Sequence, residues 1–120
     1  MKILIIDDDE ELIDVLEDLL KTDHEVTCFN DPLKAWEHYQ ENQDFNVVIT
    51  DFMMPKLRGD ALIAKIFELT PNQSFIVISG FFTKQFTDIL KISNAYIQMI
   101  KKPLDLFELE KALDSISKIR

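Results

Sequence analysis

The chain has 120 residues, 47% of them hydrophobic, and a formal net charge of -9 at pH 7. This length favours a single domain over residues 1–120, and the acidic balance argues against direct binding to nucleic acid or to an anionic membrane surface, since both need a basic footprint. Cys28 is the only cysteine, which excludes a disulfide framework, and no apolar run is long enough for a signal peptide or a membrane span, so we expect a cytoplasmic protein.

The first part of the chain alternates between apolar runs and helical patterns. Ile3–Ile6 is a continuous apolar run, and apolar residues at helical spacing follow it. Glu25–Phe29 is a second strand candidate, and Asp31-Pro32 is typical of an N-cap followed by the first residue of a helix. The helical positions that we expect to face the core are Leu12, Val15, Leu16, Leu19, Leu20, Ala35, Trp36 and Tyr39.

The same alternation continues to the end of the chain. The sequence predicts further strands at Val47–Ile49, Phe75–Ile78 and Ala95–Ile100. Apolar stripes predict three more helices, the first of them after Pro55 and Gly59. Their apolar positions are Leu62, Ile63, Ile66 and Phe67, then Phe82, Phe86, Ile89 and Leu90, and finally Leu106, Leu109, Leu113 and Ile116.

Five strand–helix units in succession predict an α/β fold with a doubly wound parallel sheet. Continuous apolar strands indicate that helices cover both faces of this sheet. Five units favour the strand order 2-1-3-4-5, which places the first and third strands side by side. In such sheets ligands bind beyond the carboxyl ends of the strands, where the order reverses.

Polar side chains follow four of the predicted strands and should meet at that edge. They are Asp7 and Asp8 after the first strand, Asp51 after the third, Ser79 after the fourth, and Lys101 and Lys102 after the fifth. Several carboxylates in one place need a cation, and an oxygen-only ligand set suits Mg²⁺. The next acid, Asp9, has a simpler explanation as the N-cap of the first helix.

Four motifs together resemble the receiver domain of two-component response regulators, the CheY-like family. They are Asp7-Asp8, the stretch DFMMPKLRG from Asp51 to Gly59, Ser79-Gly80 and Lys102-Pro103. Each lies at the end of its own predicted strand, and the D-x-x-M-P-x-x-x-G stretch is the most specific. The resemblance covers the whole chain and implies a (βα)5 flavodoxin-like fold. It implies a signalling domain whose only catalytic activity is self-dephosphorylation.

The resemblance also implies a site for phosphoryl transfer. Asp51 would be the phosphoacceptor, taking a phosphoryl group from a phosphohistidine on a sensor histidine kinase or a phosphotransfer protein. Mg²⁺ would be bound by Asp8, Asp51 and the backbone carbonyl of Met53, with Asp7 acting through water.

Two further residues would contact the phosphoryl group. Ser79 matches the hydroxyl position of the family, and Lys102 matches its lysine because it precedes Pro103. The resemblance implies a cis peptide bond between Lys102 and Pro103.

The sequence departs from the family in its fifth strand. Met99 stands where receivers commonly carry Tyr or Phe, and a flexible methionine cannot reproduce the rotation of an aromatic ring. Phe81 follows the site serine and is expected to be exposed. The downstream partner, which the sequence does not identify, is expected on the face made by the fourth helix, fifth strand and fifth helix.

Two other functions remain open at this stage. A phosphatase of the haloacid-dehalogenase type would use Asp7 as its nucleophile, and Asp7-Asp8-Asp9 contains the D-x-D pattern of that family. Glu11, however, stands where that family carries Thr or Val. The other alternative is a receiver-like binding module that is never phosphorylated. The identity of the nucleophile, Asp51 or Asp7, discriminates between receiver and phosphatase.

Overall fold

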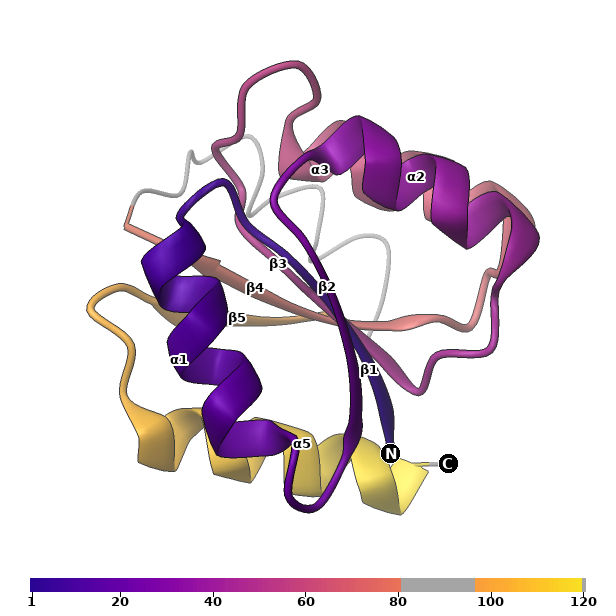
Figure 1. Ribbon diagram of the computed structural model, residues 1–120. Coiled ribbons are helices and arrows are strands. Elements are labelled where there is room, and N and C mark those ends of the chain that lie inside the picture. Colours follow the sequence, from indigo (N-terminus) through magenta and orange to yellow (C-terminus); the bar gives the residue numbers. More distant parts are fainter. Residues whose placement is uncertain (81–96, 120) are drawn as a thin grey trace.

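The computed structural model describes residues 1–80 and 97–119, which form a parallel sheet covered by helices (Figure 1). The strands are β1 (Lys2–Ile6), β2 (Glu25–Phe29), β3 (Val47–Thr50), β4 (Ser74–Ser79) and β5 (Ile97–Lys101). The helices are α1 (Glu10–Leu20), α2 (Pro32–Glu41), α3 (Gly59–Leu69) and α5 (Leu106–Ile119). The predicted helix with Phe82, Phe86, Ile89 and Leu90 lies outside the described residues.

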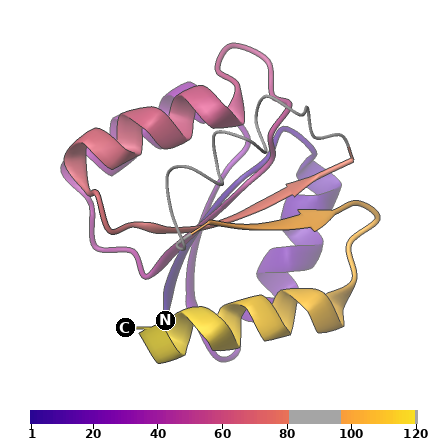
Figure 2. The same ribbon diagram turned by 180° about the vertical axis from the view of Figure 1, so that it is seen from behind.

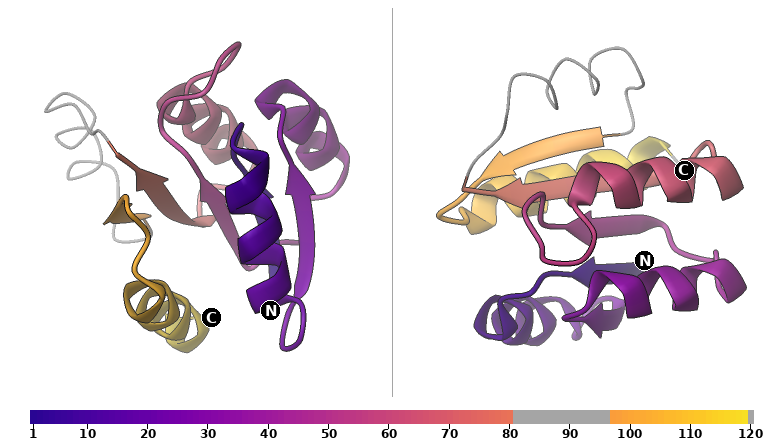
Figure 3. Two further views of the ribbon diagram at one scale, coloured as in Figure 1. Left: turned by 60° about the vertical axis from the view of Figure 1, so that its left-hand side comes forward. Right: turned by 90° about the horizontal axis from the view of Figure 1, so that it is seen from above.

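The sheet has five strands in the order β2-β1-β3-β4-β5, and every neighbouring pair is parallel. This confirms the predicted α/β class and strand order. Helices α2 and α3 cover one face of the sheet, while α1 and α5 cover the other (Figures 1 and 3). Seen from behind, β5 lies at the edge of the sheet beside β4, and α5 runs back below it (Figure 2).

The continuous apolar runs arise because both faces of the sheet are buried. In β1, Leu4 and Ile6 pack into the cluster that includes α2 and α3, while Ile3 and Ile5 pack into the cluster that includes α1 and α5. Successive side chains of a strand point to opposite faces, so a strand covered on both sides needs apolar residues at every position. All four of these side chains are fully buried.

The predicted stripe of α1 is partly wrong. The helix buries Ile13, Leu16 and Leu20, whereas Val15 and Leu19 are 51% and 46% exposed. The residues at 13, 16 and 20 follow i, i+3 and i+7 spacing, so they lie on one narrow face of the helix, and Val15 and Leu19 lie beside it. Leu106, at the start of α5, was also expected in the core and is 43% exposed.

The first two helices begin as predicted. The Asp9 side chain caps α1 by accepting hydrogen bonds from the backbone N–H groups of Glu11 and Leu12. The Asp31 side chain caps α2 in the same way, with Pro32 in the first turn. No helix within residues 1–80 and 97–119 combines the length and the apolar character that a membrane span requires.

Candidate phosphoacceptor site

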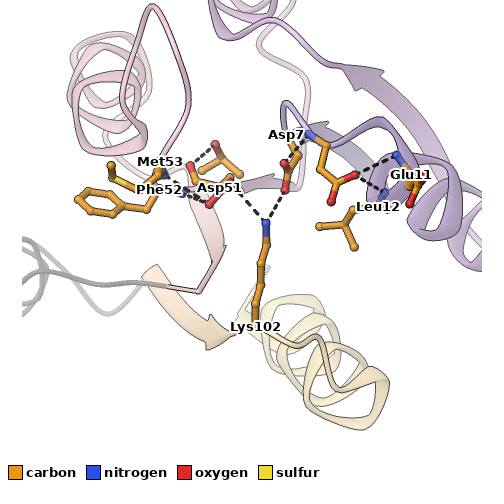
Figure 4. Close-up of polar contacts among 9 residues, drawn as sticks. Asp7, Glu11, Leu12, Asp51, Phe52, Met53 and Lys102 are labelled. Carbon is orange, nitrogen blue, oxygen red and sulfur yellow. Dashed lines mark hydrogen bonds and ion pairs between the residues drawn. The ribbon is translucent and has the colours of Figure 1, made fainter.

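The carboxyl ends of three strands bring Asp7, Asp51 and Lys102 together (Figure 4). Asp7 follows β1, Asp51 follows β3, and Lys102 follows β5. Their backbone N–H groups continue the sheet hydrogen bonding: Asp51 donates to Ile6 at 3.1 Å and Lys102 donates to Ser79 at 2.8 Å. The sheet itself therefore fixes where these three side chains start.

Asp51 is buried and its two carboxylate oxygens lie in different surroundings. Oδ1 accepts hydrogen bonds from the backbone N–H groups of Phe52, at 2.7 Å, and Met53, at 3.4 Å. Oδ2 lies 3.4 Å from Lys102 Nζ. The backbone thus orients one oxygen, and the other faces the lysine.

Asp7 shares the same lysine. Its Oδ2 also lies 3.4 Å from Lys102 Nζ, and its Oδ1 accepts a hydrogen bond of 2.9 Å from the backbone N–H of Asp9. Burial raises the pKa of Asp7 to about 6, helped by the charge of Asp51 and opposed by the Asp9 N–H and by Lys102. The Asp7 carboxylate is therefore costly to ionise unless more positive charge is brought to the site.

Lys102 supplies the positive charge that the structure places between the two acids. Burial by itself lowers the pKa of Lys102, but the charges of Asp7 and Asp51 outweigh burial and raise the pKa above its ordinary value. The lysine therefore stays protonated at neutral pH. The preceding Lys101 is exposed and ends β5, so Lys102 is the lysine of the site.

Three carboxylates form a set that fits a hard divalent cation. One oxygen each of Asp7, Asp8 and Asp51 lies within 4.8 Å of the others. Asp8 is exposed, whereas Asp7 and Asp51 are buried, so the set has an open side. All the donors are oxygen, which suits Mg²⁺. Asp9 does not belong to this set, since its side chain caps α1.

The other predicted site residues lie close by. Ser79 is the last residue of β4 and is 2% exposed, and its carbonyl accepts the hydrogen bond from Lys102 N–H. Met53 has an exposed side chain and follows Asp51 by two residues. The peptide bond between Lys102 and Pro103 is cis, as the resemblance implied. Phe81 lies outside the described residues.

The loop after Asp51 has two features that the sequence analysis missed. Leu57 N–H donates to Pro55 O at 2.8 Å, and Lys56 between them has a φ of 73°. These three residues therefore form a tight turn with a positive φ at its central residue. Lys56 Nζ lies 3.0 Å from Asp31 Oδ2. Pro55 located the loop, but a lysine carries no signal for a positive φ.

Comparison with known proteins identifies the family of this site. Residues 3–114 match the profile of the response regulator receiver domain. The receiver protein CpdR of Brucella abortus is 32% identical over 81 residues, which are 67% of this chain and 67% of CpdR. The transcriptional regulator NtrC of Azospirillum brasilense is 32% identical over 118 residues, which are 94% of this chain but 24% of NtrC.

Solved structures agree with the sequence relatives. A response regulator receiver domain protein from Clostridium thermocellum is 27% identical, with a TM-score of 0.83 over 96% of this chain and 92% of that one. A CheY-like receiver domain protein from Methanospirillum hungatei is 25% identical, with a TM-score of 0.83 over 99% of this chain and 98% of that one. The chain belongs to the response regulator receiver domain family, a family of two-component signalling domains.

Proposed function

We propose that Asp51 accepts a phosphoryl group from the phosphohistidine of a sensor histidine kinase or phosphotransfer protein, in a reaction that requires Mg²⁺. The observation that carries this proposal is the position of Asp51: one carboxylate oxygen is held by backbone N–H groups and the other faces Lys102 at 3.4 Å. Family membership supports the same assignment, because Asp51 is the acid of the D-x-x-M-P-x-x-x-G motif.

Each residue of the site has its own role in the phosphoryl transfer. The Phe52 N–H fixes the Asp51 carboxylate, so that an oxygen attacks phosphorus while the bond from phosphorus to the histidine nitrogen breaks. Lys102, released in part from Asp51, pairs with an oxygen of the transferred group. The Ser79 hydroxyl donates to another phosphoryl oxygen. These contacts favour the phosphorylated aspartate over the free acid.

The metal would be held by Asp8, Asp51 and the backbone carbonyl of Met53, with Asp7 acting through a water molecule. The carboxylate grouping supports the first two assignments, since oxygens of Asp7, Asp8 and Asp51 lie within 4.8 Å of one another. When bound, Mg²⁺ supplies positive charge for the phosphoryl oxygens. A nearby cation would favour the ionised form of Asp7, whose pKa burial raises to about 6.

Intact mass spectrometry with acetyl phosphate and Mg²⁺ tests the nucleophile. We expect one phosphoryl adduct, labile to hydroxylamine, on the wild-type protein and none on Asp51→Asn. Asp44→Asn is the control, because Asp44 is an exposed acid that pairs with Lys2. An adduct that persists in Asp51→Asn and disappears in Asp7→Asn would overturn the proposal in favour of a phosphatase-like nucleophile.

The output surface is proposed to include β5 and α5, as part of the face expected from the fourth helix, fifth strand and fifth helix. Met99 of β5 is 42% exposed and Phe107 of α5 is 67% exposed, so both apolar side chains are available for contact with a partner. Amide NMR shifts on adding beryllofluoride and Mg²⁺ should extend from Asp51 to Met99, and Ser79→Ala should reduce the distant shifts. Shifts confined to residues 7, 8 and 51 would place the output elsewhere.

A further inference from the structure

The chain has two glycines, Gly59 and Gly80, and they differ in how closely the described residues approach them. Gly59 is buried at the first residue of α3, behind the peptide that follows Asp51. A Cβ on Gly59 would lie 2.4 Å from the Asp51 carbonyl oxygen and 2.8 Å from Phe52 Cα, far inside ordinary contact distance. A Cβ on Gly80 would lie 3.9 Å from Lys102 Cβ, its nearest neighbour among the described residues.

The need for glycine at position 59 comes from this close approach. Neither glycine has a positive φ, so conformational freedom does not explain Gly59. Helix formation does not explain it either, because alanine is the better helix former. The atoms that a side chain would meet belong to the backbone, which cannot swing aside as the end of a side chain can.

We propose that Gly59 is a positioning residue for the phosphoacceptor, an inference that rests on the proposed function of Asp51. Gly59 lets the start of α3 rest directly on the Asp51–Phe52 peptide and hold it in place. Its own N–H donates to Phe52 O at 2.8 Å, which closes the loop of residues 52–59. The missing side chain and this hydrogen bond together set the distance between α3 and the peptide.

The Asp51–Phe52 peptide orients the reactive carboxylate of Asp51. Phe52 N–H, which belongs to the same peptide, holds Asp51 Oδ1 at 2.7 Å. Lys102 follows β5 and Asp7 follows β1, so neither backbone moves with the peptide after β3. A side chain at position 59 must push the peptide by about 1 Å to restore normal contact, and a misplacement of that size can cost about 100-fold in rate. The Asp51 carboxylate would then be misaligned with Lys102 and with the other carboxylates.

The test compares Gly59→Ala with two matched variants. Gly80→Ala adds the same methyl group at a position where the nearest atom among the described residues, Lys102 Cβ, is 3.9 Å away. Ile66→Val removes a methyl group from a fully buried position of the same helix, and so destabilises α3 packing without touching the Asp51 peptide. Thermal unfolding of all three, with a stabilising osmolyte where needed, selects conditions in which each protein is folded.

Three measurements then separate positioning from stability. Phosphorylation by acetyl phosphate is followed by intact mass spectrometry at saturating Mg²⁺, and Mg²⁺ affinity is measured by calorimetry. The amide shifts of Asp51 and Phe52 are recorded without metal. We expect Gly59→Ala to lower the phosphorylation rate by about 10- to 100-fold, to weaken Mg²⁺ binding and to move both amide shifts, while Gly80→Ala and Ile66→Val stay close to wild type.

Each other outcome counts against the inference. Wild-type rate and amide shifts in Gly59→Ala would show that the peptide does not depend on Gly59. If Gly59→Ala and Ile66→Val lower the phosphorylation rate equally, Gly59 contributes to stability alone. The same conclusion follows if Gly59→Ala fails to fold even with osmolyte. A wild-type protein that acetyl phosphate does not modify would overturn the proposed function instead, and the metal-free amide shifts would still decide whether Gly59 positions the peptide.

Discussion

Lys56 Nζ lies 3.0 Å from Asp31 Oδ2, and this ion pair joins the loop after β3 to the N-cap of α2. Asp31 also caps α2, because its Oδ1 accepts a hydrogen bond of 2.9 Å from Leu33 N–H. The hydrogen bond and charge of Lys56, together with the backbone N–H of Leu33, lower the pKa of Asp31. The Asp31 carboxylate thus both caps α2 and pairs with Lys56, the residue whose φ is 73°.

Replacing Lys56 separates the cost of its backbone conformation from the contribution of its ion pair. Lys56→Ala and Lys56→Gly both remove the ion pair, but only glycine adopts a positive φ without steric cost. We expect Lys56→Ala to be less stable than Lys56→Gly by about 1 kcal/mol in urea unfolding. Lys65→Ala and Lys65→Gly, within α3, are the control pair and should show the opposite order. Equal stabilities at position 56 would mean that the turn relaxes.

Without metal, the stability of the protein should fall as pH rises from about 4 to about 6. The pKa of Asp7 is raised from 3.8 to about 6, so the folded state binds more protons than the unfolded state in this window, and ionisation then favours unfolding. The expected loss is on the order of 2–3 kcal/mol. Urea unfolding in EDTA at pH 4.5 and 7.5 measures it.

A neutral side chain at position 7 should remove this loss. We expect Asp7→Asn to be more stable than wild type at pH 7.5 in EDTA, and to show a smaller fall between pH 4.5 and 7.5. Asp44→Asn, on the exposed surface, should keep the wild-type fall. A wild-type slope in Asp7→Asn would show that other carboxylates cause the pH dependence.

The neighbouring acids Asp8 and Asp9 should separate metal binding from helix capping. Asp8 offers an oxygen to the carboxylate set, whereas Asp9 Oδ1 accepts hydrogen bonds from Glu11 and Leu12 N–H. We expect Asp8→Ala to abolish most Mg²⁺ binding in calorimetry without lowering metal-free stability. Asp9→Ala should keep the affinity and lose about 1 kcal/mol of stability. Similar losses of affinity in both variants would contradict the assignment.

Removing the hydroxyl group of Ser74 should stabilise the protein. Ser74 Oγ is buried at the start of β4 and has no hydrogen-bond partner in the described part of the chain. A buried polar group without a partner costs about 1–3 kcal/mol, so Ser74→Ala should raise the free energy of unfolding. Thr50→Val is the matched variant, because the Thr50 hydroxyl is buried but donates to Asp51 O at 3.0 Å. It should lower stability, and a loss in both variants would mean that Ser74 has a partner.

Much of this fold follows from the sequence because the sheet is buried on both faces. Continuous apolar runs predict the strands, and the rule for the carboxyl ends of parallel strands predicts that Asp7, Asp51 and Lys102 lie together. The contacts of Lys102 with both acids, each at 3.4 Å, agree with that placement.

Other features could not be predicted because tertiary packing decides them. An apolar helical stripe does not say how the helix is rotated against the sheet, so Val15 and Leu19 were expected in the core and are exposed. The positive φ of Lys56 is imposed by the turn and not by the lysine. The crowding of Gly59 against Asp51 joins two elements whose distance no local pattern specifies.

The ion pair between Asp7 and Lys102 joins residues that are 95 positions apart. Chains emerge from the ribosome with the N-terminal end first, so both acids of the site are synthesised well before the lysine. A nascent or truncated chain that stops before residue 102 has the two acids without the lysine that lies 3.4 Å from both of them. The proposed site is therefore complete only in a chain whose synthesis has passed β5.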